Sequence, residues 1–184
     1  MNLFLRLLRL RLTVARRSRL DFLDVGRMPM RVALTDLDPL RHVNNGVYLS
    51  MMDLGRIDLM MRSGVWKRLT TAGYYPVVAA QTITYRKSLE LGQRFMLETA
   101  LRGFDEKAAY IEQRFVVDGE IYASAIVKAR FLKRSGGTVS LDELGALVDQ
   151  DLRVHAIDSK TARWSQDVAL PTTREPAPSL WPGA

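Results

Sequence analysis

The sequence predicts one α+β domain in which a curved antiparallel sheet wraps around a single long helix. An apolar helical pattern begins near Asn44 and stops at Ser63-Gly64. Apolar residues lie on most sides of this helix, which is typical of a helix buried inside a core. Several strand-like segments follow it without another long helix between them. Layering rules then favour a sheet packed around the helix.

Length and composition set the scale of this fold. The chain has 184 residues, of which 47% are hydrophobic, so it can bury one core but is short for two domains. We expect a basic leucine-rich segment at residues 1–27, the main domain at 28–149 and a proline-containing tail at 150–184. Four of the 7 prolines fall in the last fourteen residues, and hydrophobic periodicity fades from Gln150. We therefore expect an irregular or mobile tail.

Composition also excludes several kinds of chemistry. The chain has no cysteine, which rules out disulfides, zinc–thiolate sites, iron–sulfur clusters and a cysteine nucleophile. Its two histidines, His42 and His155, are far apart and have no partner at ligand spacing, so we expect no metal and no cofactor. The net charge of +7 suits an anionic partner. No zinc finger, RNP-like strand or helix-turn-helix pattern occurs, so nucleic acid is not expected.

The first twenty residues combine arginines with leucines and contain no acid. As a helix, they place Leu3, Phe4, Leu7, Leu10 and Val14 on one side, but strict alternation from Leu8 to Val14 fits a strand equally well. Arginines interrupt the apolar run too often for a membrane-spanning helix or a cleaved signal. Two interpretations stay open: a segment lying on an anionic membrane, or an extra element packed on the domain. The six arginines are Arg6, Arg9, Arg11, Arg16, Arg17 and Arg19.

The remaining elements each have a local signal. Residues 31–34 form a short strand candidate before the long helix. Asp118-Gly119 favours the tight turn of a hairpin. Ser140 followed by Glu143 is a capping-box arrangement, which predicts a short helix over residues 141–148. By alternation or apolar content, further strands are predicted over residues 77–86, 94–102, 110–117 and 121–133.

The most specific motif lies between the first strand and the long helix. It reads Asp36-Leu37-Asp38-Pro39-Leu40-Arg41-His42-Val43-Asn44-Asn45-Gly46-Val47-Tyr48. This segment resembles the active-site segment of the 4-hydroxybenzoyl-CoA thioesterase branch of the hotdog superfamily. Asp53 and Arg56 continue the match, and residues 85–92 resemble a strand end and turn of the same family. The resemblance covers residues 36–92 and implies a hotdog fold and an acyl thioester substrate. The HVNN form is also similar to plant acyl-carrier thioesterases and to a group of mammalian thioesterase-like proteins.

Thioester hydrolysis explains these residue types. It needs a nucleophile or an activated water, and hydrogen-bond donors where the carbonyl oxygen gains charge. Asp38 supplies the carboxylate, as nucleophile or as general base, and His42 assists it or binds substrate. Backbone N–H groups near the helix start polarise the carbonyl. The predicted substrate-binding residues are Asn44, Asn45, Gly46, Tyr48 and Asp53.

Each candidate also has a purely structural interpretation. Asp38 can stabilise its own turn, and Asn44 and Asn45 can cap the helix. Asp53 and Arg56 can form an ordinary helix pair. Leu40 stands where the plant enzymes carry Asn, so their full set of site residues does not carry over. Basic residues on the strands reach coenzyme A phosphates or are simply solvated; these are Tyr85-Arg86-Lys87 with Lys128, Arg130, Lys133 and Arg134.

Two functions from different classes follow. The first is an acyl-CoA thioesterase, cytoplasmic and in peripheral contact with an anionic membrane, that assembles as a homodimer or tetramer through sheet edges. The second is a non-catalytic hotdog module that binds acyl chains or a partner protein. A hydratase would need an Asp and a His at a spacing that the sequence lacks. The discriminating observation is whether the Asp38 carboxylate is free or tied into its turn.

Overall fold

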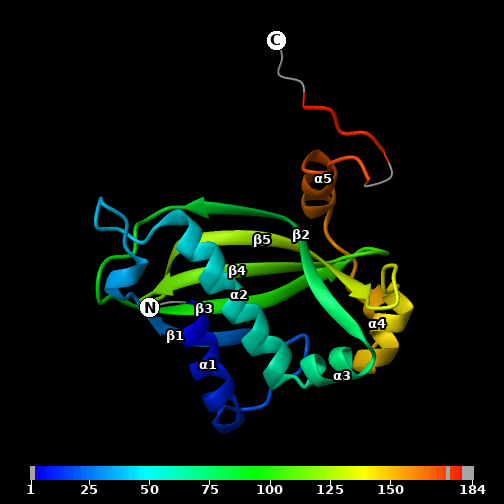
Figure 1. The fold of residues 1–184 in the computed structure, drawn as a ribbon, viewed down its shortest axis with the longest axis horizontal. Coiled ribbons are helices and arrows are strands. Elements are labelled where there is room, and N and C mark those ends of the chain that lie inside the picture. Colours follow the sequence, from blue (N-terminus) through cyan, green and yellow to red (C-terminus); the bar gives the residue numbers. More distant parts are fainter. Residues whose placement is uncertain (1–2, 173–174, 180–184) are drawn as a thin grey trace.

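In the computed structural model, which describes residues 3–172 and 175–179, a five-stranded antiparallel sheet curves around one long helix (Figure 1). The predicted α+β arrangement is confirmed. The strands lie in the order β1-β3-β4-β5-β2. Their bounds are β1 Gly26–Arg31, β2 Tyr74–Tyr85, β3 Arg94–Phe104, β4 Ala109–Val117 and β5 Glu120–Lys133. The helices are α1 Leu3–Thr13, α2 Asn45–Arg62, α3 Val65–Thr71, α4 Leu141–Val148 and α5 Ser159–Asp167, with short 3-10 turns η1 Val14–Arg16, η2 Leu34–Asp36 and η3 Leu152–His155.

The long helix α2 begins and ends where the sequence indicates. The Asn44 side chain accepts a hydrogen bond from the Gly46 amide at 2.8 Å, which caps the first turn. Gly64, with φ of 76°, adopts a left-handed conformation just after the last turn and allows α3 to start. Half of the residues of α2 are buried, on most of its sides, because the sheet curves around it. These are Tyr48, Met51, Met52, Leu54, Gly55, Arg56, Asp58, Leu59 and Met60.

The middle of α2 approaches the sheet closely because residue 55 is a glycine. A Cβ atom at Gly55 would lie 2.7 Å from Thr99 Oγ1 and 2.8 Å from Leu97 Cδ2, so any larger residue would force the layers apart. Two apolar clusters lie on either side of this contact. One surrounds Phe115 beneath the first half of α2, and the other surrounds Phe131 and includes residues of α3 and α4.

The strands match most of the predictions, with one difference at the first. The β4–β5 hairpin turns at Asp118-Gly119, both with positive φ, as predicted. The helix at 141–148 begins with the predicted capping box. The first strand covers Gly26–Arg31 rather than residues 31–34. It is an edge strand that pairs only with β3, and an edge tolerates the missing N–H of Pro29, which had masked the strand in the sequence.

The prediction of an irregular tail is wrong for residues 159–167, which form helix α5. Asp158 caps this helix by accepting from the Thr161 amide at 3.0 Å. Trp164 Nε1 donates to Thr82 Oγ1 at 2.8 Å, and the Ser165 and Tyr110 hydroxyl oxygens lie 2.7 Å apart. These polar anchors, rather than apolar periodicity, hold α5 to the sheet. Residues 173–174 and 180–184 of the predicted tail lie outside the described residues.

Candidate active site

The turn that precedes α2 is closed by its own backbone. The Asp38 amide donates to the His42 carbonyl at 2.9 Å, and the Arg41 amide donates to the Asp38 carbonyl at 2.9 Å. Arg41 has φ of 66°, which reverses the chain. The Asn44 amide then donates to the Asp36 carbonyl at 2.9 Å. This turn delivers Asn44 to the cap of α2 and fixes Asp38 just ahead of the helix.

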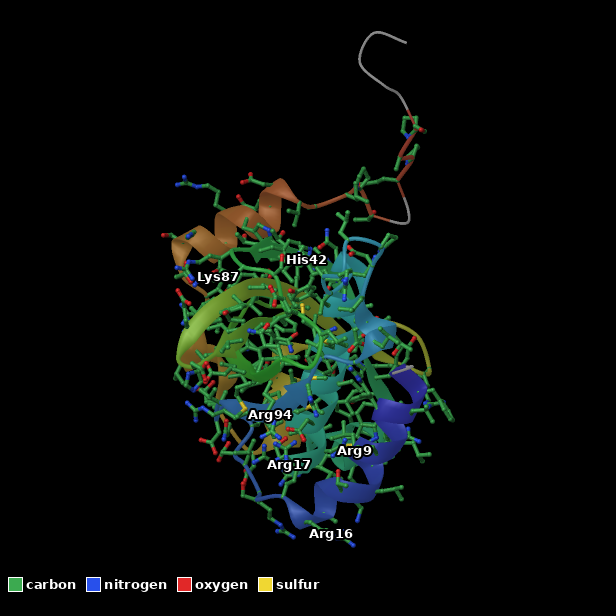
Figure 2. All side chains as sticks on the ribbon, turned by 90° about the vertical axis from the view of Figure 1, so that its left-hand side faces the viewer. Arg9, Arg16, Arg17, His42, Lys87 and Arg94 are labelled. Atoms are coloured by element: carbon green, nitrogen blue, oxygen red, sulfur yellow. The ribbon has the colours of Figure 1, made fainter. Side chains whose placement is uncertain are left out.

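The Asp38 carboxylate is tied at one oxygen and open at the other. Its Oδ1 atom accepts from the Leu40 amide at 2.9 Å and from the His42 amide at 3.3 Å. Its Oδ2 atom has no hydrogen bond to any residue that the structure describes. The side chain is half-buried, and His42 is exposed on the same turn, as Figure 2 shows near its top. The two structural options for Asp38 are therefore combined, because it braces the turn and still presents a carboxylate oxygen.

Of the backbone amides of residues 44–47 at the helix start, one has no recorded hydrogen-bond acceptor in the described chain. The Gly46 amide is taken by the Asn44 side chain, and the Val47 amide donates to the Asn44 carbonyl at 2.9 Å. The Asn44 amide is used by the turn. Within the described chain no acceptor is recorded for the Asn45 amide. It lies at the positive end of the helix dipole, where a developing negative charge would be stabilised.

Tyr48 supports this region from inside the core. Its side chain is 2% exposed, and its hydroxyl oxygen accepts from the Leu89 amide at 3.1 Å. The ring packs edge-on against Phe115 and Tyr85, and burial raises the pKa of the Tyr48 phenol. The Tyr85 hydroxyl in turn donates to the Asn45 carbonyl at 3.3 Å. In this chain Tyr48 anchors the end of the site, and its substrate-binding role stays a prediction.

Asp53 belongs to a second polar group, in the middle of α2. The buried Arg56 guanidinium forms an ion pair with Asp53 and donates to Gln113 Oε1 at 2.6 Å. Gln113 is fully buried and donates to the Met52 carbonyl at 3.0 Å and to Thr99 Oγ1 at 2.9 Å. Burial lowers the pKa of Arg56, and the Asp53 charge opposes that shift. The Asp53 side chain remains 50% exposed, so this network reaches from the core to the surface.

This network borders an apolar cavity of about 360 Å³ between α2 and β2. Asp53 and Arg56 line it together with apolar side chains of α2, of the helix that follows and of four strands, among them Trp66, Val77 and Phe131. Asp38 and His42 line neither this cavity nor the larger groove beside α1. Along α2, Asn45 and Asp53 are separated by about 12 Å, given a rise of about 1.5 Å per residue. The chain alone thus brings Asp38, His42 and Asn45 together and leaves Asp53 at a separate position.

The sequence analysis assigned no role in the site or its support to Gln113, Thr99 or Gly55. One signal was available for Gln113, because it stands between Ile111 and Phe115 on the inward face of a strand, where a polar residue needs partners. Gly55 carried no such signal, since the close approach that it allows depends on tertiary packing.

A curved antiparallel sheet wrapped around a central helix is the architecture of the hotdog fold. Residues 32–170 match the family model of the thioesterase-like superfamily. The chain belongs to this superfamily.

Relatives and solved structures agree with this assignment. Protein THEM6 of Xenopus laevis is 41% identical over 95 residues, which are 52% of this chain and 46% of that protein. Protein THEM6 of Danio rerio is 40% identical over 100 residues, covering 54% of this chain and 50% of that protein. The chain spans about half the length of the curated relatives it matches.

Two solved structures show the fold. YbaW, a probable thioesterase from Escherichia coli, superposes with a TM-score of 0.64 at 22% identity, over 69% of this chain and 98% of that chain. The DHNA-CoA thioesterase from Staphylococcus aureus superposes with a TM-score of 0.61 at 13% identity, over 80% of this chain and 97% of that chain. At these identities the likeness concerns the fold alone.

The buried network predicts strong coupling between Arg56 and Gln113. Gln113→Leu should destabilise the fold by about 2–4 kcal/mol, because it leaves a buried guanidinium short of an acceptor. Arg56→Met added to it should recover part of that loss. Chemical denaturation of the two single variants and the double variant measures the coupling, expected at about 0.5–3 kcal/mol. Strict additivity would mean that the pair does not interact energetically.

Proposed function

We propose that the chain hydrolyses acyl-CoA thioesters at the turn before α2, with Asp38 as the reacting carboxylate. The observation that carries the proposal is the open Oδ2 atom of Asp38 in the turn just before α2, together with the unpaired amide of Asn45 at the first position of that helix. Hydrolysis of a thioester needs this combination of a carboxylate and an oxyanion donor. Membership of the thioesterase-like superfamily supports the reaction, and the name of the Staphylococcus aureus neighbour supports the substrate class.

Two mechanisms fit the same atoms. Asp38 attacks the carbonyl carbon and forms a mixed anhydride that water then hydrolyses, or it takes a proton from a water that attacks. In both, the thioester oxygen gains negative charge and the coenzyme A thiolate leaves. The Asn45 amide and the dipole of α2 stabilise that charge. His42 assists the carboxylate or contacts the substrate from the exposed side of the turn.

The acyl chain is proposed to run along α2 into the cavity beside β2. A cavity of about 360 Å³ falls in the range of small-molecule pockets, and its walls are mostly apolar. A chain extended from Asn45 would reach Asp53 after about 12 Å of helix. Asp53 then lies where the chain enters the cavity rather than at the reacting carbonyl.

The active unit is proposed to be a homodimer, or a tetramer built from two dimers, joined along β2. Of the two sheet edges, β1 is short and carries Pro29, which blunts it. β2 has 12 residues and pairs only with β5, and Tyr75, Val78 and Tyr85 on it are exposed. Pairing two β2 strands across a two-fold axis would bring a neighbouring strand to the site as its far wall.

The second candidate is a non-catalytic module that holds acyl chains. It is favoured by the apolar cavity and by the hydrogen bonds that tie Asp38 Oδ1 into its turn. The two candidates differ in one measurement, which is the release of free thiol from bound acyl-CoA.

Asp38→Asn should keep the fold and lower kcat by at least about 10²-fold, the lower end of general-base effects. The amide oxygen of Asn can still accept from Leu40 and His42, so the turn should persist. A panel of acyl-CoA esters assayed for free thiol, with thermal melting as the control, makes the test. Equal turnover by both proteins would remove Asp38 from the mechanism. A wild type that binds the esters and cleaves none would establish the non-catalytic module.

Asn45→Pro tests the amide itself. Proline is favoured at the first position of a helix, and Asn44 has φ of −59° and ψ of 137°, which suits a residue before proline. The substitution removes the N–H group and the Asn45 side chain, so kcat should fall by about 10²–10³-fold with little change in melting temperature. Asn45→Ala keeps the amide, and the ratio of the two variants isolates its contribution. A ratio near one would show that this amide is not the oxyanion donor.

If each site is formed by Asp38 of one chain and β2 of its neighbour, two chains that are inactive for different reasons should complement each other. Gln81 is exposed and lies on the same face of β2 as Ile83, which packs against the core, so Gln81→Trp should block the proposed far wall of the site. Mixed with Asp38→Asn chains, it should form hybrid dimers that regain activity in about half of their sites. Light scattering at assay concentration reports the dimer. An active monomer, or hybrids that never recover activity, would contradict the shared site.

A further inference from the structure

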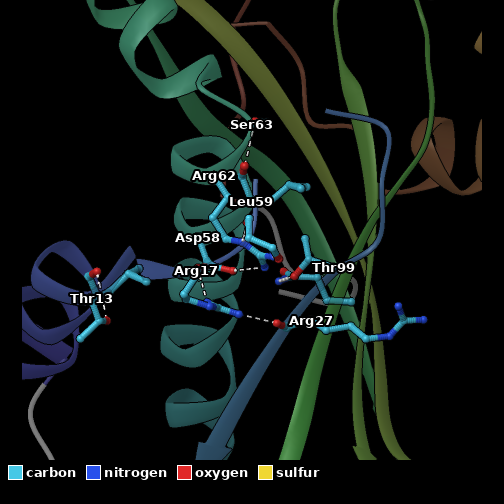
Figure 3. A network of polar contacts seen from close by, with 11 residues as sticks. Thr13, Arg17, Arg27, Asp58, Leu59, Arg62, Ser63 and Thr99 are labelled. Atoms are coloured by element: carbon cyan, nitrogen blue, oxygen red, sulfur yellow. Dashed lines mark hydrogen bonds and ion pairs between the residues drawn. The ribbon is translucent and has the colours of Figure 1, made fainter. Parts of the chain in front are cut away.

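Helix α1 packs on the domain through Arg6 and Leu10, which are both buried. Arg6 is 6% exposed and pairs with Asp36, which is 2% exposed. Arg17, just after η1, pairs with Asp58 of α2 and donates to the Arg27 carbonyl (Figure 3). Buried carboxylates need such partners, so these two pairs fix the rotation of the segment about its axis. Leu10, at 3% exposed, is covered by the core.

This rotation turns three other leucines of α1 outward. Leu5, Leu8 and Leu12 are 53%, 45% and 70% exposed, and their spacing of three and four residues places them on one ridge. The ridge lies opposite Arg6 and Leu10. As a helix, the sequence places Phe4 on the same side as Leu10, whereas in the structure Phe4 is 67% exposed and Leu10 is buried. Exposed leucines are common singly, whereas three on one ridge form a continuous apolar surface.

Cations flank the ridge on both sides. Arg9, Arg11, Arg16 and Arg19 are exposed, and no acidic residue occurs before Asp21. None of the four forms a salt bridge with a residue in the described ranges. Figure 2 labels Arg9 and Arg16 in the lower part of the view, beside the blue helix α1. A groove lies nearby, between α1 and β1. Arg9, Arg31 and Arg94 line it, together with methionines.

We infer that α1 docks the protein on an anionic lipid surface through the ridge of Leu5, Leu8 and Leu12. An apolar ridge between arginines is the pattern of a helix that lies in the membrane interface, with leucines in the acyl boundary and cations at the phosphates. No helix in the described part of the chain has the length and apolar content to cross a bilayer.

A second copy of the chain fits this face less well than a membrane does. In a two-fold contact the ridge would meet itself, and the arginines of both copies would be brought together without acids between them. A lipid surface offers phosphates to the same arginines. Leu7, on the inner side of α1, lines the apolar cavity, so docking would also place that cavity next to the lipid.

The test measures binding of the full chain to vesicles of phosphatidylcholine alone and of phosphatidylcholine with about one third phosphatidylglycerol. The wild type should co-sediment with the anionic vesicles, and added salt should weaken binding. Joint substitution of Leu5, Leu8 and Leu12 by Ser should lower partitioning at least about tenfold. The matched control removes three exposed apolar side chains elsewhere, by Val154→Ser, Val168→Ser and Leu170→Ser, and should bind like the wild type.

Charge is tested in the same way. Arg9→Gln, Arg11→Gln and Arg16→Gln together should lower binding to anionic vesicles. Arg130→Gln, Arg134→Gln and Arg163→Gln change the net charge equally and should have a much smaller effect. Equal losses from both arginine sets, or full binding by the leucine variant, would reduce the effect to general electrostatic adsorption and overturn the docking face. If the wild type does not bind anionic vesicles even at low salt, the docking face is also overturned.

Insertion of the ridge has its own readout. The chain contains no cysteine, so Leu8→Cys carries a single environment-sensitive fluorophore, and Val154→Cys is its control. Anionic vesicles should shift the Leu8 label to an apolar signal and leave the control unchanged. Equal signals, or leucine variants that dissociate an oligomer in light scattering, would assign the face to something other than lipid. Thiol release from a soluble short-chain ester should be unaffected by the leucine substitutions, so docking and catalysis are judged separately.

Discussion

The contact between Gly55 and the sheet is the constraint on which the rest of the structure depends. A helix buried on most sides can enter a curved sheet only if one point lets the two layers approach. At Gly55, Thr99 and Leu97 come within the space that a Cβ would occupy. Next to that point, Gln113 and Arg56 fill the interior with polar atoms whose hydrogen bonds are satisfied. The depth and angle of α2 follow from this one close approach.

The position of the candidate site follows from the position of α2. The start of the helix is fixed by Asn44, and the turn before it is closed by hydrogen bonds between Asp38 and His42. Tyr48 and Tyr85 brace the same end from the core and from β2. The Asp38 carboxylate and the Asn45 amide are therefore held by backbone and core rather than by a mobile loop. Such preorganisation is what electrostatic catalysis requires.

The sequence allowed prediction of the features that depend on local chemistry. Caps, the Asp118-Gly119 hairpin and the apolar pattern of α2 are local signals, and they located α2 and most strands. The motif around Asp38 is contiguous, so its residues were bound to lie together. Features that depend on distant partners were missed. Helix α5 is held by polar contacts to Tyr110 and Thr82, and the rotation of α1 is set by Asp36 and Asp58, far along the chain.

The edge of β2 and the ridge on α1 suit different partners. β2, with 12 residues, is an edge strand, and its outward row of donors and acceptors can pair with another strand. The α1 ridge offers no such groups, since a helix satisfies its own backbone, and it adds cations around leucines. A strand partner therefore gains nothing at α1, and lipid cannot satisfy the edge of β2. Because Arg6 and Arg17 fix α1 through buried acids, the ridge keeps its outward orientation without any partner. The proposed assembly edge and the proposed docking ridge are thus separate surfaces, and the candidate site lies at the start of α2, the helix that both elements contact.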